Sequence, residues 1–137
     1  MLKGSCLCGG VTYESGDLLG RIGHCHCRTC RKAHGAAFAT TSRVARSSFR
    51  WVSGTELLGS YESSPGKHRH FCTRCGTHLM AEWEGEDSVI LRLGALDTDP
   101  GQVPAGHIWT SHAVPWLAYG PELPMYPEGV PQGNAAR

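Results

Sequence analysis

Cys72-Thr73-Arg74-Cys75-Gly76 is a pair of cysteines separated by two residues and followed by a glycine. Two thiolates at this spacing can reach one metal ion from the same turn, and the glycine supplies the backbone freedom that such a turn needs. A structural zinc ion takes four protein ligands. This segment therefore predicts half of a zinc site, and two more ligands have to come from elsewhere in the chain.

The other five of the seven cysteines lie in two earlier clusters, Cys6-Leu7-Cys8 and Cys25-His26-Cys27-Arg28-Thr29-Cys30. Cysteines this close together rarely bridge each other, and an odd number argues against a disulfide framework. If the first cluster completes the site of Cys72 and Cys75, a four-thiol site forms and a three-thiol site is left whole. This arrangement uses every thiol and is the one we favour. Spacing alone leaves open the other arrangement, in which two cysteines of the second cluster complete the site.

Other interpretations of the cysteines are weaker. An iron–sulfur cluster also takes thiolates. Pairs of the form Cys-x-Cys together with a separate Cys-x-x-Cys segment fit mononuclear zinc better. A redox-active pair would be expected in a thioredoxin-like βαβ pattern, which the sequence lacks. Buried cysteines of an apolar core would be scattered, whereas these are clustered.

Composition limits the other function classes. The 137 residues carry a net charge of +1, so no strong basic field would gather nucleic acid. No apolar run approaches the roughly 20 residues of a membrane helix, and the segment after Met1 lacks the apolar core of a signal peptide. We therefore expect a cytoplasmic protein that binds neither nucleic acid nor membranes.

The rest of the sequence predicts a mostly β, antiparallel fold. The chain is rich in turn-forming residues, with 18 glycines and 8 prolines. Residues 29–34 are the segment expected to be helical, with Thr29 as the cap. We expect a single zinc-binding β domain over residues 1–128 and a flexible tail over residues 129–137. Alternation and β-branched or aromatic content predict strands at 11–14, 37–41, 48–52, 57–62, 69–72, 77–83, 88–93 and 108–110.

Together these segments resemble the glutathione-dependent formaldehyde-activating enzyme family, which also contains centromere protein V. The resemblance continues through several weaker motifs as far as about Tyr126. It is carried by Gly4-Ser5-Cys6-Leu7-Cys8-Gly9-Gly10-Val11, Cys25-His26-Cys27-Arg28-Thr29-Cys30-Arg31-Lys32, Phe71-Cys72-Thr73-Arg74-Cys75-Gly76-Thr77, Gly94-Ala95-Leu96-Asp97, His107-Ile108 and Pro115-Trp116.

The resemblance implies a small zinc-bound fold called a β-tent. It implies that Cys6, Cys8, Cys72 and Cys75 bind a structural Zn²⁺, and that Cys25, Cys27 and Cys30 bind a catalytic Zn²⁺. It also implies a carbon–sulfur lyase that joins formaldehyde and glutathione into S-hydroxymethylglutathione, or cleaves this adduct. The partners expected from it are a small-molecule thiol and an aldehyde.

Three protein ligands leave one tetrahedral position of zinc for a substrate thiol, which the metal would hold as its thiolate. Near this position, Arg28, Arg31 and Lys32 are candidates to attract the carboxylates of glutathione. His26 is a candidate proton shuttle. The alternative is a non-catalytic, zinc-stabilised binding module, in which His24 or His26 fills the fourth position.

Overall fold

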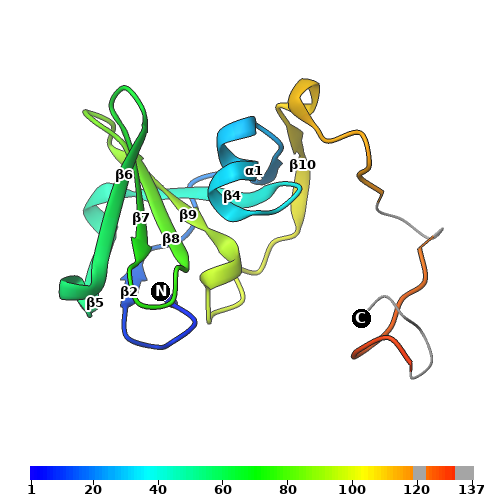
Figure 1. Cartoon of the computed structure of the whole chain (residues 1–137). Coiled ribbons are helices and arrows are strands. Elements are labelled where there is room, and N and C mark those ends of the chain that lie inside the picture. The colour runs from blue at the N-terminus through cyan, green and yellow to red at the C-terminus, as the bar shows by residue number, and fades with distance from the viewer. Residues whose placement is uncertain (119–122, 132–137) are drawn as a thin grey trace.

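The computed structural model describes residues 1–118 and 123–131. These residues form two β-sheets and one short α-helix, α1, at Arg28–His34 (Figure 1). The smaller sheet has the strand order β1-β2-β5, with β1 Leu2–Ser5, β2 Thr12–Ser15 and β5 Arg50–Ser53. The larger sheet has the order β10-β3-β4-β9-β8-β7-β6, with β3 Ile22–Cys25, β4 Ala39–Ala45, β6 Leu58–Ser64, β7 Lys67–Cys72, β8 His78–Trp83, β9 Ser88–Arg92 and β10 Pro104–Ile108. The mostly β fold is as the sequence predicted.

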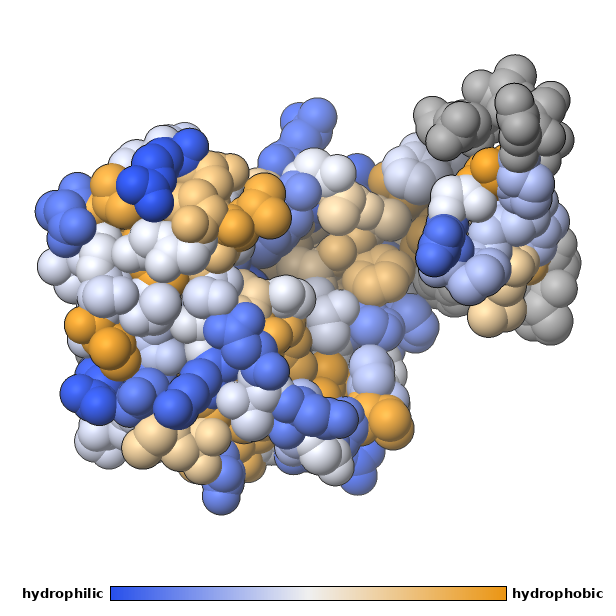
Figure 2. Space-filling model, turned by 90° about the horizontal axis from the view of Figure 1, so that it is seen from below, coloured by the Kyte–Doolittle hydropathy of each residue, from blue (hydrophilic) through white to orange (hydrophobic). Residues whose placement is uncertain are grey.

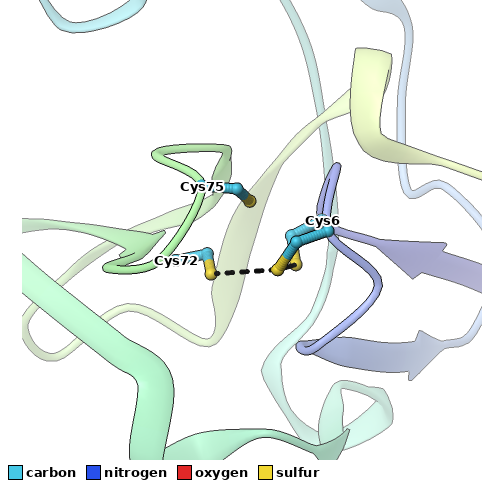
Figure 3. A group of neighbouring side chains, drawn as sticks. Cys6, Cys72 and Cys75 are labelled. Carbon is cyan, nitrogen blue, oxygen red and sulfur yellow. Dashed lines mark hydrogen bonds between the residues drawn. The ribbon is translucent and has the colours of Figure 1, made fainter.

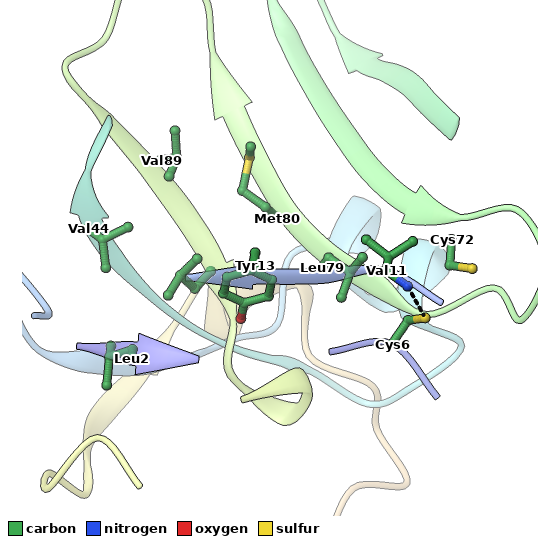
Figure 4. Close-up of a cluster of buried hydrophobic side chains, with 10 residues drawn as sticks. Leu2, Cys6, Val11, Tyr13, Val44, Cys72, Leu79, Met80 and Val89 are labelled. Atoms are coloured by element: carbon green, nitrogen blue, oxygen red, sulfur yellow. Dashed lines mark hydrogen bonds between the residues drawn. The ribbon is translucent and has the colours of Figure 1, made fainter. Parts of the chain in front are cut away.

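The main core lies where the two sheets meet. Tyr13 of β2 is 1% exposed and packs its ring against Phe49 and Trp51. Strand β9 has four successive buried residues, so both faces of this strand are covered. Cys6 and Cys72 belong to the same core, which places one group of thiols at its edge (Figure 4). The buried members are Leu2, Cys6, Val11, Tyr13, Val44, Cys72, Leu79, Met80, Val89 and Leu91.

One strand pair departs from the predicted antiparallel arrangement. Strand β10 pairs with β3 in parallel, with Ile108 opposite Cys25. About 80 residues separate the two strands in the sequence. The chain forms β4 to β9 between them before β10 pairs with β3. This return brings β10 beside the second cysteine cluster.

Most of the predicted strand and helix boundaries differ from the observed ones by one or more residues, and two of the differences have a clear structural cause. The helix begins at Arg28 with Cys27 as its cap, rather than at Thr29, because the thiol of Cys27 accepts from the backbone N–H of Cys30. The strand predicted over 108–110 instead ends at Ile108, because Trp109 has a φ of 57° and the chain turns there into a 3-10 turn, Thr110–His112.

Four short connecting elements complete the description of the regular structure. They are the 3-10 turns Arg46–Ser48, Thr55–Leu57, Leu93–Ala95 and Thr110–His112. After the last of them, residues 113–118 lead away from the sheets (Figure 1). Of the predicted tail, residues 129–131 contain no helix or strand, and residues 132–137 lie outside the described part of the chain.

Hydrophilic and hydrophobic residues are interspersed over the face of the molecule that Figure 2 shows. The described part of the chain contains no helix that is both long and apolar enough to cross a membrane.

Candidate metal centres

Four thiols from two segments that are far apart in the sequence meet at the edge of the core. The ligand atoms of Cys6, Cys8, Cys72 and Cys75 all lie within 4.8 Å of one another. The sulfur of Cys8 is 3.5 Å from that of Cys6 and 3.9 Å from that of Cys72. Figure 3 shows the side chains from the two segments pointing toward a common space. Cys72 and Cys75 are therefore grouped with Cys6 and Cys8, and not with two cysteines of the second cluster.

Two tight turns hold these sulfurs in place. In the second turn, Gly76 has a φ of 80° and its N–H donates to the carbonyl of Cys72 at 2.8 Å. This left-handed conformation favours glycine, which explains the residue after the second cysteine. In the first turn, the backbone N–H of Val11 donates to the sulfur of Cys6 at 3.2 Å. Such N–H donors stabilise sulfur in its thiolate form.

Hydrogen bonds favour the thiolate at two of these cysteines. The hydroxyl and backbone of Thr77 lower the pKa of Cys75 to about 5. A backbone hydrogen bond from Gly10, and then the guanidinium of Arg74, lower the pKa of Cys8. Arg74 donates from Nε to the sulfur of Cys8 at 3.2 Å. Burial, by contrast, raises the pKa of Cys6. A bound divalent cation would favour the thiolate at all four positions.

The second group of thiols lies at the start of helix α1. The ligand atoms of Cys25, Cys27 and Cys30 lie within 4.8 Å of one another, and the group contains no His, Asp or Glu from the described residues. Cys25 ends β3, Cys27 caps the helix, and Cys30 lies one turn into it. The strand-to-helix turn therefore brings the three sulfurs to one point.

Neighbouring groups affect the charge of these thiols in opposite ways. The hydrogen bond between Cys25 and Cys30 raises the pKa of Cys25 and lowers that of Cys30 to about 4. Burial also raises the pKa of Cys25. The charge of Arg92 and a hydrogen bond from Arg69 further favour the thiolate of Cys30. A bound divalent cation would favour the thiolate at all three positions.

Both groups fit zinc by their chemistry. All donors are thiols, none is in a disulfide, and the two groups have the four-ligand and three-ligand compositions of structural and open zinc sites. The histidines proposed as a fourth ligand lie elsewhere. His24 Nδ1 is 2.8 Å from the hydroxyl of Thr40, and His26 Nε2 is 2.8 Å from His107 Nδ1.

The three-thiol group opens into a cavity of about 580 Å³. Four cationic side chains line it, Arg21, Arg43, Lys67 and Arg92. Two of them interact electrostatically with Cys27 and Cys30, namely Arg92 at the end of β9 and Lys67 at the start of β7. Arg92 is 4% exposed, and its Nε and Nη2 have no hydrogen-bond partner within the described ranges. Burial, followed by the charge of Arg69, lowers the pKa of Arg92 to about 10, so Arg92 is still a cation at neutral pH. The cavity therefore offers positive charge next to the thiols.

The cations expected from the sequence lie outside this cavity. Arg28 and Lys32 are exposed on helix α1, and Arg31 is partly buried. None of the three lines the three-thiol cavity, and Lys32 lines a different one. His26 is fully buried and does not line it either.

Sequence reasoning missed Arg92, Lys67 and Arg69. The one available signal was a charged residue at the end of the apolar run Val89-Ile90-Leu91, because a buried strand rarely contains an unpaired cation. Nothing in the local sequence connects β7 and β9 with the second cysteine cluster. Their proximity follows from the sheet order alone.

Comparison with known proteins agrees with this site. The model of the glutathione-dependent formaldehyde-activating enzyme family matches residues 1–112, which contain both cysteine groups. A Schizosaccharomyces pombe protein named as an uncharacterized lyase is 35% identical over 77 residues, covering 56% of this chain and 54% of that protein. A Halomonas elongata protein that carries the name of the family is 31% identical over 86 residues, covering 58% and 54%. The matches thus span about half the length of these relatives.

A Rhodobacter sphaeroides protein of known crystal structure has a similar fold. The TM-score is 0.62 at 27% sequence identity, and the match covers 74% of this chain and 97% of the other.

Proposed function

Since the chain belongs to the glutathione-dependent formaldehyde-activating enzyme family, we propose that it is a zinc-dependent carbon–sulfur lyase. Its proposed reaction joins or cleaves a thiol–aldehyde adduct such as S-hydroxymethylglutathione. In this proposal Cys6, Cys8, Cys72 and Cys75 hold a structural Zn²⁺, and the three-thiol group holds a catalytic one. Residues 1–128 act as one domain, with residues 129–137 as a flexible tail.

The observation that carries the proposal is the three-thiol group beside a cavity. A structural zinc site is closed by four protein ligands, whereas a catalytic site keeps one position for substrate. In the described residues, the group of Cys25, Cys27 and Cys30 contains no fourth ligand. A non-catalytic module would need a ring nitrogen of His24 or His26 at that position, and neither histidine belongs to the group.

The proposed chemistry needs a thiolate next to an aldehyde. Zinc held by the three cysteines would keep an incoming thiol deprotonated, which is its nucleophilic form. In the joining direction the sulfur forms a bond to the aldehyde carbon, the C=O π electrons move to oxygen, and the oxygen takes up a proton. In the cleaving direction the hydroxyl loses its proton, the C=O bond forms again, and the carbon–sulfur bond breaks.

Arg92 and Lys67 are proposed to bind the carboxylates of glutathione. They take the role that the sequence suggested for Arg28, Arg31 and Lys32, because they line the cavity and interact electrostatically with Cys27 and Cys30. Buried guanidinium N–H groups gain most from a charged acceptor. The Lys67 ammonium lies 5.3 Å from the ring centre of Trp83, which also lines the cavity and limits where the ammonium can go.

We assign His26 a positioning role rather than proton transfer at the reacting atoms. Its backbone N–H donates to the carbonyl of Ile108 at 2.9 Å, and its ring pairs with His107. Both bonds connect the end of β3 with β10, and Ile108 lines the cavity. His26 thus holds one wall of the cavity next to the thiols.

The test is the rate of adduct formation from glutathione and formaldehyde, followed by exchange NMR with the zinc-loaded chain. The proposal expects exchange well above the uncatalysed rate, and loss of this acceleration in Cys27→Ser. Absence of acceleration with two zinc ions bound per chain would contradict it. Replacing glutathione by neutral 2-mercaptoethanol then tests whether the carboxylates matter.

A further inference from the structure

A second cavity, of about 490 Å³, lies along helix α1 and shares no lining residue with the three-thiol cavity. Its walls come from α1, β6, β7 and the start of β8. The lining residues are Thr29, Lys32, Ala33, Tyr61, Ser63, Arg69, Phe71 and His78. None of these is a carboxylate, so the cavity has cationic and hydroxyl groups but no negative charge of its own.

Arg69 is the most deeply buried of the polar residues that line this cavity. Its side chain is 1% exposed. Nε donates to the hydroxyl of Ser63 at 2.8 Å, and Nη2 donates to the hydroxyl of Thr29 at 3.1 Å. Nη1 is buried and has no partner in the part of the chain that the structure describes. A buried guanidinium N–H without an acceptor is costly, and native proteins rarely leave one unpaired.

A second unpaired group lies in the same wall. His78 Nδ1 is buried and also lacks a partner among the described residues. Burial, followed by the charges of Arg92 and Arg69, lowers the pKa of His78, so the ring is neutral near pH 7 and donates from one nitrogen. Lys32 adds an ammonium from the exposed side of α1. Arg69 and Lys32, from β7 and α1, favour an anionic oxygen by their charge. His78, from β8, donates to such an oxygen in the tautomer that carries its proton on Nδ1.

We propose that this cavity binds a small organic anion, with its carboxylate or phosphate at Arg69 Nη1 and Lys32. The apolar part of the ligand would lie against Tyr61 and Phe71, which line the same space. Charge-assisted hydrogen bonds to a guanidinium are among the strongest that a protein makes with an oxyanion. The site is separate from the lyase reaction proposed above and does not depend on it.

The ligand would have a direct structural connection to the three-thiol group. Arg69 also donates from Nη2 to the sulfur of Cys30 at 3.8 Å. An anion at Nη1 would fix the guanidinium in its present position, and so fix one hydrogen bond to the thiol. Binding of an anion in this cavity would therefore affect the three-thiol group through the hydrogen bond to Cys30.

The experiment is an NMR titration of the zinc-loaded, ¹⁵N-labelled chain with sodium phosphate and, separately, with sodium benzoate. We expect saturable shifts of the backbone amides of Thr29, Ala33 and Ser63 with at least one probe. Shifts at Phe71 with benzoate alone would identify a carboxylate carrying an apolar group as the better ligand. Stronger binding of phosphate would identify a phosphate instead.

The variants are Lys32→Gln and its control Arg28→Gln. Both residues are exposed on the same short helix and carry the same charge, but only Lys32 lines the cavity. Loss of one charge-assisted contact should weaken binding about three- to tenfold in Lys32→Gln, and less than about twofold in the control. Arg69→Gln is avoided because Arg69 also supports the fold.

Three results would overturn the proposal. The first is no saturable shift with either probe up to about 50 mM, a concentration at which a weak anion site would be filled. The second is a set of shifts centred on Gly23, Thr41 and Gly106, which line the other cavity, and lost in Lys67→Gln. The third is equal weakening by Lys32→Gln and Arg28→Gln, which would mean a general effect of helix charge.

Discussion

Nη2 of Arg69 lies 3.8 Å from the sulfur of Cys30, although 39 residues separate them in the sequence. The guanidinium belongs to β7, and the thiol belongs to helix α1. The same buried guanidinium donates to the hydroxyls of Ser63 and Thr29, so it joins β6, β7 and the helix in one hydrogen-bond network. Helix α1 has only seven residues and would be marginal alone. Its position over the sheet therefore depends on contacts of this kind.

Replacing Arg69 should destabilise the fold. Arg69→Gln removes the donor to the buried sulfur of Cys30 and the donors to the hydroxyls of Ser63 and Thr29, so we expect a loss of about 2–4 kcal/mol in the free energy of unfolding. The matched control is Arg50→Gln, which removes the ion pair of the largely exposed Arg50 with Glu14 and should cost less than about 1 kcal/mol. Urea denaturation with saturating zinc measures both. Equal losses of unfolding free energy in the two variants would mean that the hydrogen bonds of Arg69 contribute no more than an exposed ion pair.

Lys67→Gln should weaken glutathione binding without unfolding the chain. The ammonium lines the three-thiol cavity and is half-buried, so its loss should raise KM for glutathione about 5- to 10-fold. KM for neutral 2-mercaptoethanol should hardly change. Lys3→Gln, at an exposed position on β1, is the control. A KM that rises equally for both thiols would show that Lys67 shapes the cavity rather than binding a carboxylate.

His34 should make the fold sensitive to acid. Burial, followed by the charges of Arg92, His78 and Arg69, lowers its pKa from 6.5 to about 3. The unfolded chain therefore takes up a proton near pH 6.5, while the folded chain does not. Stability that is present above pH 6.5 is lost as the pH falls toward 3, by about 1.4 kcal/mol per pH unit for this group.

The measurement compares unfolding of the zinc-saturated wild type and His34→Gln between about pH 7.5 and 5.5, the range in which an unfolded histidine titrates. The wild type should lose more stability than the variant on acidification, and subtraction removes effects common to both, including proton competition for the thiols. His112→Gln, at an exposed position, should follow the wild type. Parallel curves for wild type and His34→Gln would contradict the prediction.

Gly54→Ala should be much more harmful than Gly85→Ala. Both glycines have a left-handed φ, 80° and 77°. A Cβ on Gly54 would also collide with the carbonyl oxygen of Gly10, whereas nothing lies within 4 Å of a Cβ on Gly85. We expect about 1 kcal/mol for Gly85→Ala, from backbone strain alone, and more than about 2 kcal/mol for Gly54→Ala. Thermal unfolding of the two variants gives the comparison.

Local spacing was enough to predict the cysteine groups. Cys72 and Cys75 share a turn, and so do the members of each other cluster, so convergence needed little long-range information. The sequence favoured a common site for Cys8 and Cys72 only because this arrangement used every thiol. The fold brings their sulfurs to 3.9 Å from each other. The strands were predicted from alternation, except β1 and β3, which are four residues long and contain glycine, and β10, of which only Ile108 was predicted.

The cationic surroundings of the thiols could not be predicted in this way. Arg28, Arg31 and Lys32 are adjacent to Cys30 in sequence, but a helix directs successive side chains to different faces. Arg92 and Arg69 are distant in sequence and reach the thiols because β9 and β7 lie in the same sheet as β3. Parallel pairing of β10 with β3, which brings Ile108 opposite Cys25, is equally non-local.

The most direct test of the two-zinc account is the zinc content and exchange of Cys27→Ser and Cys72→Ser beside the wild type. We predict two zinc ions per wild-type chain, of which one responds to added glutathione. Cys27→Ser should stay folded, keep the inert ion and lose the response to glutathione, whereas Cys72→Ser should unfold because structural zinc is coupled to folding. A wild type with one inert zinc, or equal unfolding of both variants, would contradict the assignment of a structural and a catalytic site.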